Sequence, residues 1–160
     1  MEKATLYYHV KRKEDLLYLI TKSSIEKLEA DVHKALKGIN CPFEQLAVLI
    51  QAHCTSLLRD QTQHATALAE VRALSEERLA EVAGMRKSYQ KGIRQIIDAG
   101  QSRGVIRSDV DPRYLASMLM GLLDRSVNWY RKAGPLGPAD LAGHLTDIYL
   151  FGAQPQERID

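Results

Sequence analysis

Apolar residues recur at intervals of three and four along most of the chain, which is the spacing that lines one face of an α-helix. Runs in which apolar and polar residues alternate, which would indicate strands, are short. The pattern predicts helices over about 12–37, 42–60, 63–74, 75–103, 112–133 and 139–151. We therefore expect an all-α fold.

Residues that commonly begin or end helices support these boundaries. Gly38 is expected to end the first long helix, and Pro42 suits the first turn of the next. Ser75 is a natural N-cap, and Asp111 followed by Pro112 predicts the start of the fifth helix.

The helix predicted from Pro112 is the most apolar segment of the chain, and its apolar residues cover more than one face. Such a helix is buried on more than one side. In a chain of 160 residues this suggests the subunit's own core on one side and a partner subunit on another.

Composition narrows the functional classes. Apolar residues are 45% and charged residues 26% of the chain, as in ordinary globular domains, and the net charge is only +2. Nucleic-acid binding would therefore need a local basic patch. Cys41 and Cys54 form no disulfide framework and fit the cytoplasm, and no apolar run approaches the roughly 18 residues of a membrane span.

The sequence carries no known catalytic motif, phosphate-binding loop or dinucleotide fingerprint, so we expect neither an enzyme nor a cofactor. His53, Cys54 and His64 are candidate metal ligands in space, but no ligand pair has metal-site spacing. We favour ordinary packing or surface roles for them and expect no metal.

Two clusters have both a functional and a structural interpretation. Basic residues at 3, 11, 12 and 13, against Glu2, give 4 − 1 = +3 around Thr5-Leu6-Tyr7-Tyr8-His9. They would contact DNA phosphates, or form a solvated charge run. Arg125 and Trp129 share a helix face. They would meet an anionic ligand, or Arg125 would pair with a carboxylate such as Asp124, Asp98 or one from a partner subunit.

The stretch from Lys3 to Leu17 (KATLYYHVKRKEDLL) resembles the end of the helix-turn-helix of tetracycline-repressor (TetR) family regulators, with Val10 where phenylalanine is usual. The segment 104–112 (GVIRSDVDP) and the helical pattern of nearly the whole chain are also similar to that family. The resemblance implies a TetR-like C-terminal helical bundle that dimerises through its last two long helices.

The resemblance also implies site residues. The DNA-contacting set would be Ala4, Thr5, Tyr7, Tyr8 and His9, with Lys13 on a phosphate. The ligand pocket would contain His53, Leu57, Arg86, Tyr89, Met118, Leu122, Arg125 and Trp129. The dimer interface would contain Leu119, Leu122, Val127, Leu141, Leu145 and Ile148.

Family members carry two further helices and the start of the recognition helix before this point, and the first helix braces the second in the major groove. We therefore divide the chain into a helix-turn-helix remnant (1–11), a ligand-binding and dimerisation domain (12–152) and a tail (153–160). This chain should bind operator DNA weakly or not at all. We favour a truncated product over a relative that lacks the motif, because residues 5–13 keep a DNA-contacting pattern.

The expected function is a ligand-responsive transcriptional repressor, homodimeric and cytoplasmic. Trp129-Tyr130-Arg131, followed by Gly134-Pro135-Leu136-Gly137-Pro138, resembles a subgroup that responds to acyl-CoA thioesters or other lipid-like acids. The alternative is a dimer without a helix-turn-helix, which binds a small molecule or draws a full-length relative into inactive heterodimers.

Overall fold

The computed structural model describes the backbone of residues 3–153 and the side chains of residues 12–152. Within that part every regular element is helical, which confirms the all-α prediction. None of these helices is long and apolar enough to span a membrane. The elements are α1 (Lys3–Ala35), α2 (Pro42–Arg59), α3 (Gln61–Glu70), the single-turn η1 (Val71–Ala73), α4 (Glu76–Ser102), α5 (Pro112–Trp129) and α6 (Pro138–Ala153).

Helix α1 is longer than the sequence pattern predicted. It begins at Lys3, whereas the pattern placed the start of the first long helix near Arg12. Because neither proline nor glycine occurs before Gly38, nothing local interrupts the helix. The proposed boundary between residues 11 and 12 therefore lies inside one continuous helix.

The other helix ends lie close to their predicted positions. Asp111 caps α5 by accepting a hydrogen bond of 2.8 Å from the backbone N–H of Arg113. Gly104 takes the left-handed conformation (φ +69°) after α4, and glycine adopts this conformation without strain. Ser75 precedes α4 without a side-chain cap, and its N–H instead donates to the Glu14 carboxylate of α1.

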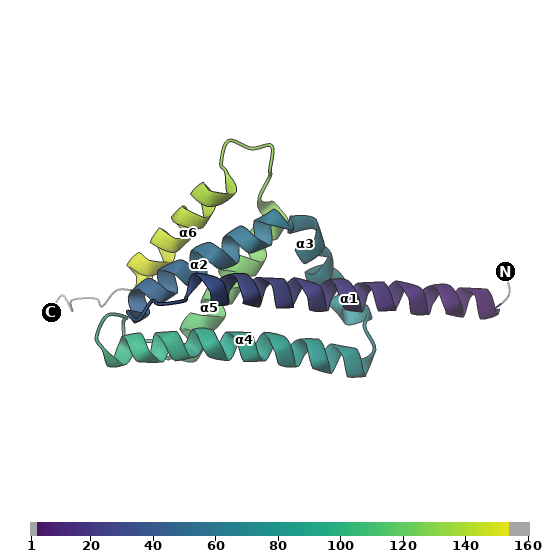
Figure 1. Cartoon of the computed structure of the whole chain (residues 1–160), viewed down its shortest axis with the longest axis horizontal. Coiled ribbons are helices and arrows are strands. Elements are labelled where there is room, and N and C mark those ends of the chain that lie inside the picture. Colours follow the sequence, from purple (N-terminus) through teal and green to yellow (C-terminus); the bar gives the residue numbers. More distant parts are fainter. Residues whose placement is uncertain (1–2, 154–160) are drawn as a thin grey trace.

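In Figure 1, α1 and α4 lie side by side along the long axis, α2 and α6 cover one side, and α5 crosses behind them. Helix α2 is central because it packs against α1, α4, α5 and α6. The N-terminal turns of α1 extend beyond the end of α4 (Figure 1).

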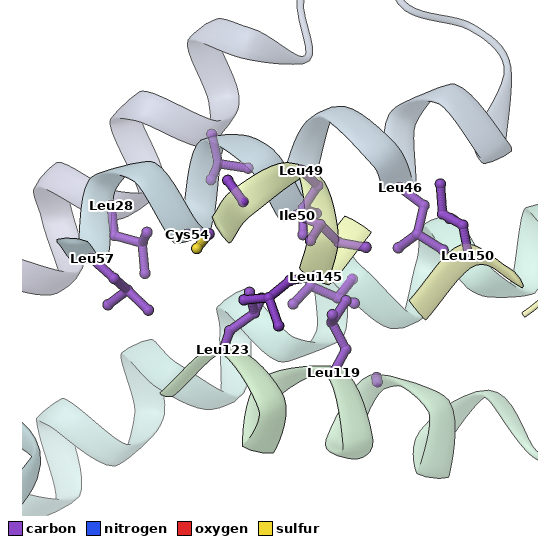
Figure 2. Close-up of a cluster of buried hydrophobic side chains, with 14 of the residues drawn as sticks. Leu28, Leu46, Leu49, Ile50, Cys54, Leu57, Leu119, Leu123, Leu145 and Leu150 are labelled. Carbon is purple, nitrogen blue, oxygen red and sulfur yellow. The ribbon is translucent and has the colours of Figure 1, made fainter. Parts of the chain in front are cut away.

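One large hydrophobic cluster holds α2, α5 and α6 together. Figure 2 shows Leu119 and Leu123 of α5 pointing toward Leu145 of α6 and Ile50 of α2. All four side chains are buried inside the single subunit. The two helices that were predicted to dimerise therefore contribute their inward faces to the core, together with α2.

A smaller contact region ties the first half of α1 to α4. Tyr18 and Lys22 both bond Glu81, and Arg78 bonds Asp15 at 2.6 Å. These pairs are largely exposed, so each stabilises the contact only weakly. A small apolar cluster beneath them, Leu17 with Leu74 and Val82, supplies buried packing. Helix α1 is thus held to α4 ahead of its contact with the main core.

Candidate functional site

An open groove lies between α1, α2 and α4, with a volume of about 700 Å³. This volume is within the range of small-molecule pockets. Its floor is mostly apolar, formed by Val32, Leu36, Leu49, Ile93 and Ile96. The groove has the size and lining to hold the apolar body of a small ligand.

Carboxylates line the α1 side of this groove. Glu26 and Glu29 both contribute to it, together with His33. Partial burial, with a smaller effect of the neighbouring Glu26, raises the pKa of the Glu29 carboxyl. An anionic group on a ligand would be repelled here, so only an uncharged part of an acid is expected in the groove.

A second, smaller and less open cavity of about 40 Å³ lies between α1, α2, α3, α4 and α5. Tyr89 lines both the groove and this inner cavity, and therefore separates them. Five of the inner cavity's other lining residues are polar or charged; the full set is Thr21, Ser24, Ile25, Leu28, Leu57, His64, Ala67, Leu68, Arg86, Met120 and Asp124.

His53 supports the Tyr89 side chain from the core. Its Nδ1 lies 2.9 Å from the Tyr89 hydroxyl, and the two rings pack at a tilt. The imidazole is fully buried, and burial, reinforced by the positive charges of His64 and Arg86, lowers the His53 pKa to about 3. His53 is therefore neutral at physiological pH. Burial also raises the pKa of the Tyr89 hydroxyl, which keeps this group neutral as well.

The two charges beside the inner cavity form an ion pair. Arg86 of α4 donates to Asp124 of α5. Burial raises the pKa of Asp124, while the Arg86 charge and hydrogen bond act in the opposite direction. His64 is also buried, and that burial lowers its pKa. Arg86 and Asp124 neutralise each other, and burial disfavours the charged forms of His53 and His64. The cavity therefore presents hydrogen-bonding groups and little net charge.

On the other side of α4, facing α5, lies a polar hollow of about 730 Å³. Lys87, Lys91, Arg94 and Arg113 line it against a single acidic residue, Asp98. Ser88 borders both this hollow and the apolar groove. A basic surface therefore adjoins the apolar one across α4.

The structure brings together only part of the predicted ligand pocket. Leu57, Arg86 and Tyr89 line the inner cavity, and His53 contacts Tyr89 from the core without lining the cavity or the groove. The remaining four residues line neither the groove nor the inner cavity. Leu122 is half-buried against the core, and the other three are exposed on α5: Met118, Arg125 and Trp129.

Sequence reasoning missed Thr21, Ser24 and Glu29, all on α1. Thr21 and Ser24 are polar residues on the buried face of the helix, four positions after Leu17 and four before Leu28. Polar side chains inside an apolar stripe are the signal that would have identified them.

The residues predicted for the dimer interface fall into buried and exposed groups. Leu119, Val127, Leu141 and Leu145 are buried in the subunit's own core, so their side chains are not available to a partner. Ile148 is 67% exposed. The sequence pattern assigned these four to the interface, whereas they are buried in the single subunit, because helical spacing does not reveal which apolar face meets which neighbour. The large exposed apolar residues of α5 and α6 are Tyr114, Met118, Trp129, Ile148 and Phe151.

Of the predicted DNA-contacting residues, only Lys13 has a described side chain, and it is exposed. The side chains of the others lie outside the described residues, although their backbone belongs to α1: Ala4, Thr5, Tyr7, Tyr8 and His9.

Known proteins with similar sequences and structures share this architecture. The family model described as "Tetracyclin repressor-like, C-terminal domain" matches residues 40–153. The fatty acid metabolism regulator protein of Bacillus subtilis is 27% identical over 153 residues, which covers 92% of this chain and 77% of the relative.

Two solved structures show the likeness in three dimensions. The TetR family regulator PfmR from Thermus thermophilus aligns with a TM-score of 0.80 and 27% identity, over 99% of this chain and 84% of PfmR. AibR in complex with isovaleryl coenzyme A and operator DNA aligns with a TM-score of 0.75 and 24% identity, over 98% of this chain and 83% of AibR.

These relatives are transcriptional regulators, which agrees with the prediction that the chain is not an enzyme. The family model covers most of the chain, from α2 to α6, and the PfmR structure aligns over nearly the whole chain. On this evidence the chain belongs to the TetR family of transcriptional regulators.

Proposed function

We propose that this protein is an effector-responsive repressor in which α1 carries the signal. The observation that supports this most directly is the continuity of α1. Residues between 21 and 33 of this helix line the inner cavity and the groove, and its first turns carry the proposed DNA-contacting motif. Because the helix is unbroken, a tilt imposed at the cavity moves its N-terminal end.

In this mechanism the effector binds the helix arrangement that fits it better and shifts the population toward that arrangement. The groove and the inner cavity are separated by Tyr89, so a ligand occupying both would displace this side chain and press on α1. In a dimer of the complete regulator, with the rest of the helix-turn-helix present, the resulting tilt changes the separation of the two DNA-contacting ends and lowers operator affinity.

The effector class that fits best is an acid with an apolar body, such as an acyl-CoA. The groove is apolar, and its acidic α1 side places the anionic end elsewhere. A Bacillus relative is a fatty acid metabolism regulator, and AibR was solved with isovaleryl coenzyme A. Arg125 and Trp129, four positions apart and both exposed, offer a cation and an indole to a nucleotide.

Replacing Arg125 and Trp129 together by alanine should abolish binding of decanoyl-CoA and leave the dimer intact. The phosphates would lose their cation and the adenine its stacking surface. Calorimetric titration measures the affinity, and light scattering measures the mass. Lys87→Glu with Lys91→Glu is the comparison, since it reverses two exposed charges in the basic hollow. If only the Lys87/Lys91 variant lost affinity for decanoyl-CoA, the nucleotide would bind in the hollow between α4 and α5 and not at Arg125 and Trp129.

Gly92 offers a test of the groove itself. A Cβ at this position meets no atom within 4 Å, so packing does not require glycine, although glycine within a helix costs about 1 kcal/mol relative to alanine. Gly92→Ala should therefore stabilise the protein. Gly92→Phe should remain folded and fill the groove.

Thermal unfolding with and without decanoyl-CoA measures the effect. Ligand at about 100 times its Kd adds about 2.7 kcal/mol, or roughly 5–10 °C, to the wild type and the alanine variant. Gly92→Phe should show no ligand shift. If decanoyl-CoA raised the thermal midpoint of Gly92→Phe as much as that of the wild type, the effector would not bind in the groove.

We also propose a homodimer formed by the outward faces of α5 and α6. Tyr114 and Met118 lie four positions apart on one side of α5, and Ile148 and Phe151 are exposed on α6. Exposed large apolar side chains that gather on two neighbouring helices are typical of a subunit contact.

A further inference from the structure

Thr21 is a buried hydroxyl without a partner. Its side chain is 2% exposed, it lines the inner cavity, and its Oγ1 has no hydrogen-bond partner among the described residues. Ser24, on the same helix face, donates to the carbonyl of Ile20 at 2.8 Å and so satisfies its hydroxyl. Leaving a buried polar group unpaired is costly, and such groups are rare in folded proteins.

The neighbouring groups determine what kind of atom would pair with Thr21. Arg86 and Asp124 neutralise each other, and burial disfavours the charged form of His64. A carboxylate or an ammonium group would therefore enter without a counter-charge, at the desolvation cost of an unpaired ion. A hydroxyl or a carbonyl oxygen would bond Thr21 at no such cost.

The size of the cavity limits the group further. About 40 Å³ holds a group of only a few heavy atoms, whereas the groove beyond Tyr89 has about 700 Å³ for the body of the ligand. An oxygen carried on an apolar chain or ring would reach Thr21 once Tyr89 moves aside.

Resting on the effector proposal above, we propose that the effector's apolar part is oxygenated, and that the Thr21 hydroxyl selects it by bonding a neutral keto or hydroxyl oxygen in the inner cavity. A plain hydrocarbon chain leaves Thr21 unpaired, while an oxygenated chain satisfies it. Specificity then comes from a residue on α1, the helix that carries the signal.

The test compares decanoyl-CoA with ketodecanoyl-CoA thioesters in which the keto group occupies successive chain positions. For the wild type we expect at least one keto position to bind at least 10-fold more tightly than decanoyl-CoA. Thr21→Val keeps the shape and removes the hydroxyl, so that preference should fall to within 2-fold, while Thr21→Ser should retain it. The matched control is Thr146→Val, because Thr146 is equally buried but its hydroxyl already donates to the Ala142 carbonyl.

A ligand-free measurement keeps this inference separate from the effector proposal. Thr21→Val should raise the thermal midpoint of the free protein, since it removes an unpaired group, and Thr146→Val should not. The inference is overturned if no keto position is preferred, if the preference survives in Thr21→Val, or if Thr21→Val lowers the midpoint. Failure of decanoyl-CoA itself to bind, with a raised Thr21→Val midpoint, would overturn the effector class alone.

Discussion

Ile148→Arg should split the dimer into folded monomers, whereas Leu145→Arg, three positions away on α6, should prevent the subunit from folding. Leu145 is 5% exposed and points toward Leu119 in the core (Figure 2). An unpaired guanidinium there costs several kcal/mol, comparable with the roughly 5–15 kcal/mol that stabilises a domain. Ile148 is 67% exposed, so arginine at that position is solvated in the single subunit.

The effect of Ile148→Arg arises only on association. In a two-fold symmetric contact both copies of the arginine are buried together, with no carboxylate supplied by the substitution. We expect the dimer Kd to rise at least ~100-fold, which corresponds to about 2.8 kcal/mol.

Light scattering across a dilution series gives the mass of each variant, and circular dichroism gives its helix content. Tyr114→Arg on α5 should behave like Ile148→Arg, because Tyr114 is also exposed on the proposed face. A dimer of unchanged affinity in both surface variants would place the subunit contact elsewhere. A folded Leu145→Arg subunit would contradict the described core.

The free energy of unfolding should fall as the pH drops from about 6.5 toward 5. Burial holds the His53 pKa at about 3 in the folded protein, well below the ordinary 6.5 of the unfolded chain. Below pH 6.5 the unfolded state therefore binds a proton that the folded state excludes. The loss approaches about 1.4 kcal/mol per pH unit once the pH is below the unfolded value. His64, whose pKa is also lowered, acts in the same direction.

Urea unfolding at pH 7.5, 6.5, 5.75 and 5.0 measures this dependence. His53→Gln removes the titrating group, so its stability should vary clearly less with pH over this range. His144→Gln is the control, because His144 is exposed. The interval stops at pH 5, above the range in which carboxyls such as Asp111, with a pKa of about 2, titrate. An identical pH dependence in His53→Gln and the wild type would show that His53 is not the source.

The sequence by itself determined the helices and the family. Helical periodicity, the Asp111 cap with Pro112, and the stop at Gly104 are local features, set by residues within a few positions of one another. The motif from Lys3 to Leu17 is local too, and it pointed to the TetR family that the fold and the comparisons then supported. Helix α1 starts at Lys3, whereas the periodicity predicted a start near Arg12. The reason is that no proline or glycine interrupts the helix before Gly38.

Only the tertiary structure decided which apolar face of a helix packs in the core and which is exposed. Leu145 and Ile148 look alike in the sequence, and α6 buries one while it exposes the other. The contacts of the candidate site join residues far apart in the chain, such as His53 with Tyr89 and Arg86 with Asp124. Thr21 lacks a partner only because of where α3, α4 and α5 lie relative to α1. A helical period shows that a stripe is buried, but the neighbouring helices determine whether it faces core, cavity or partner.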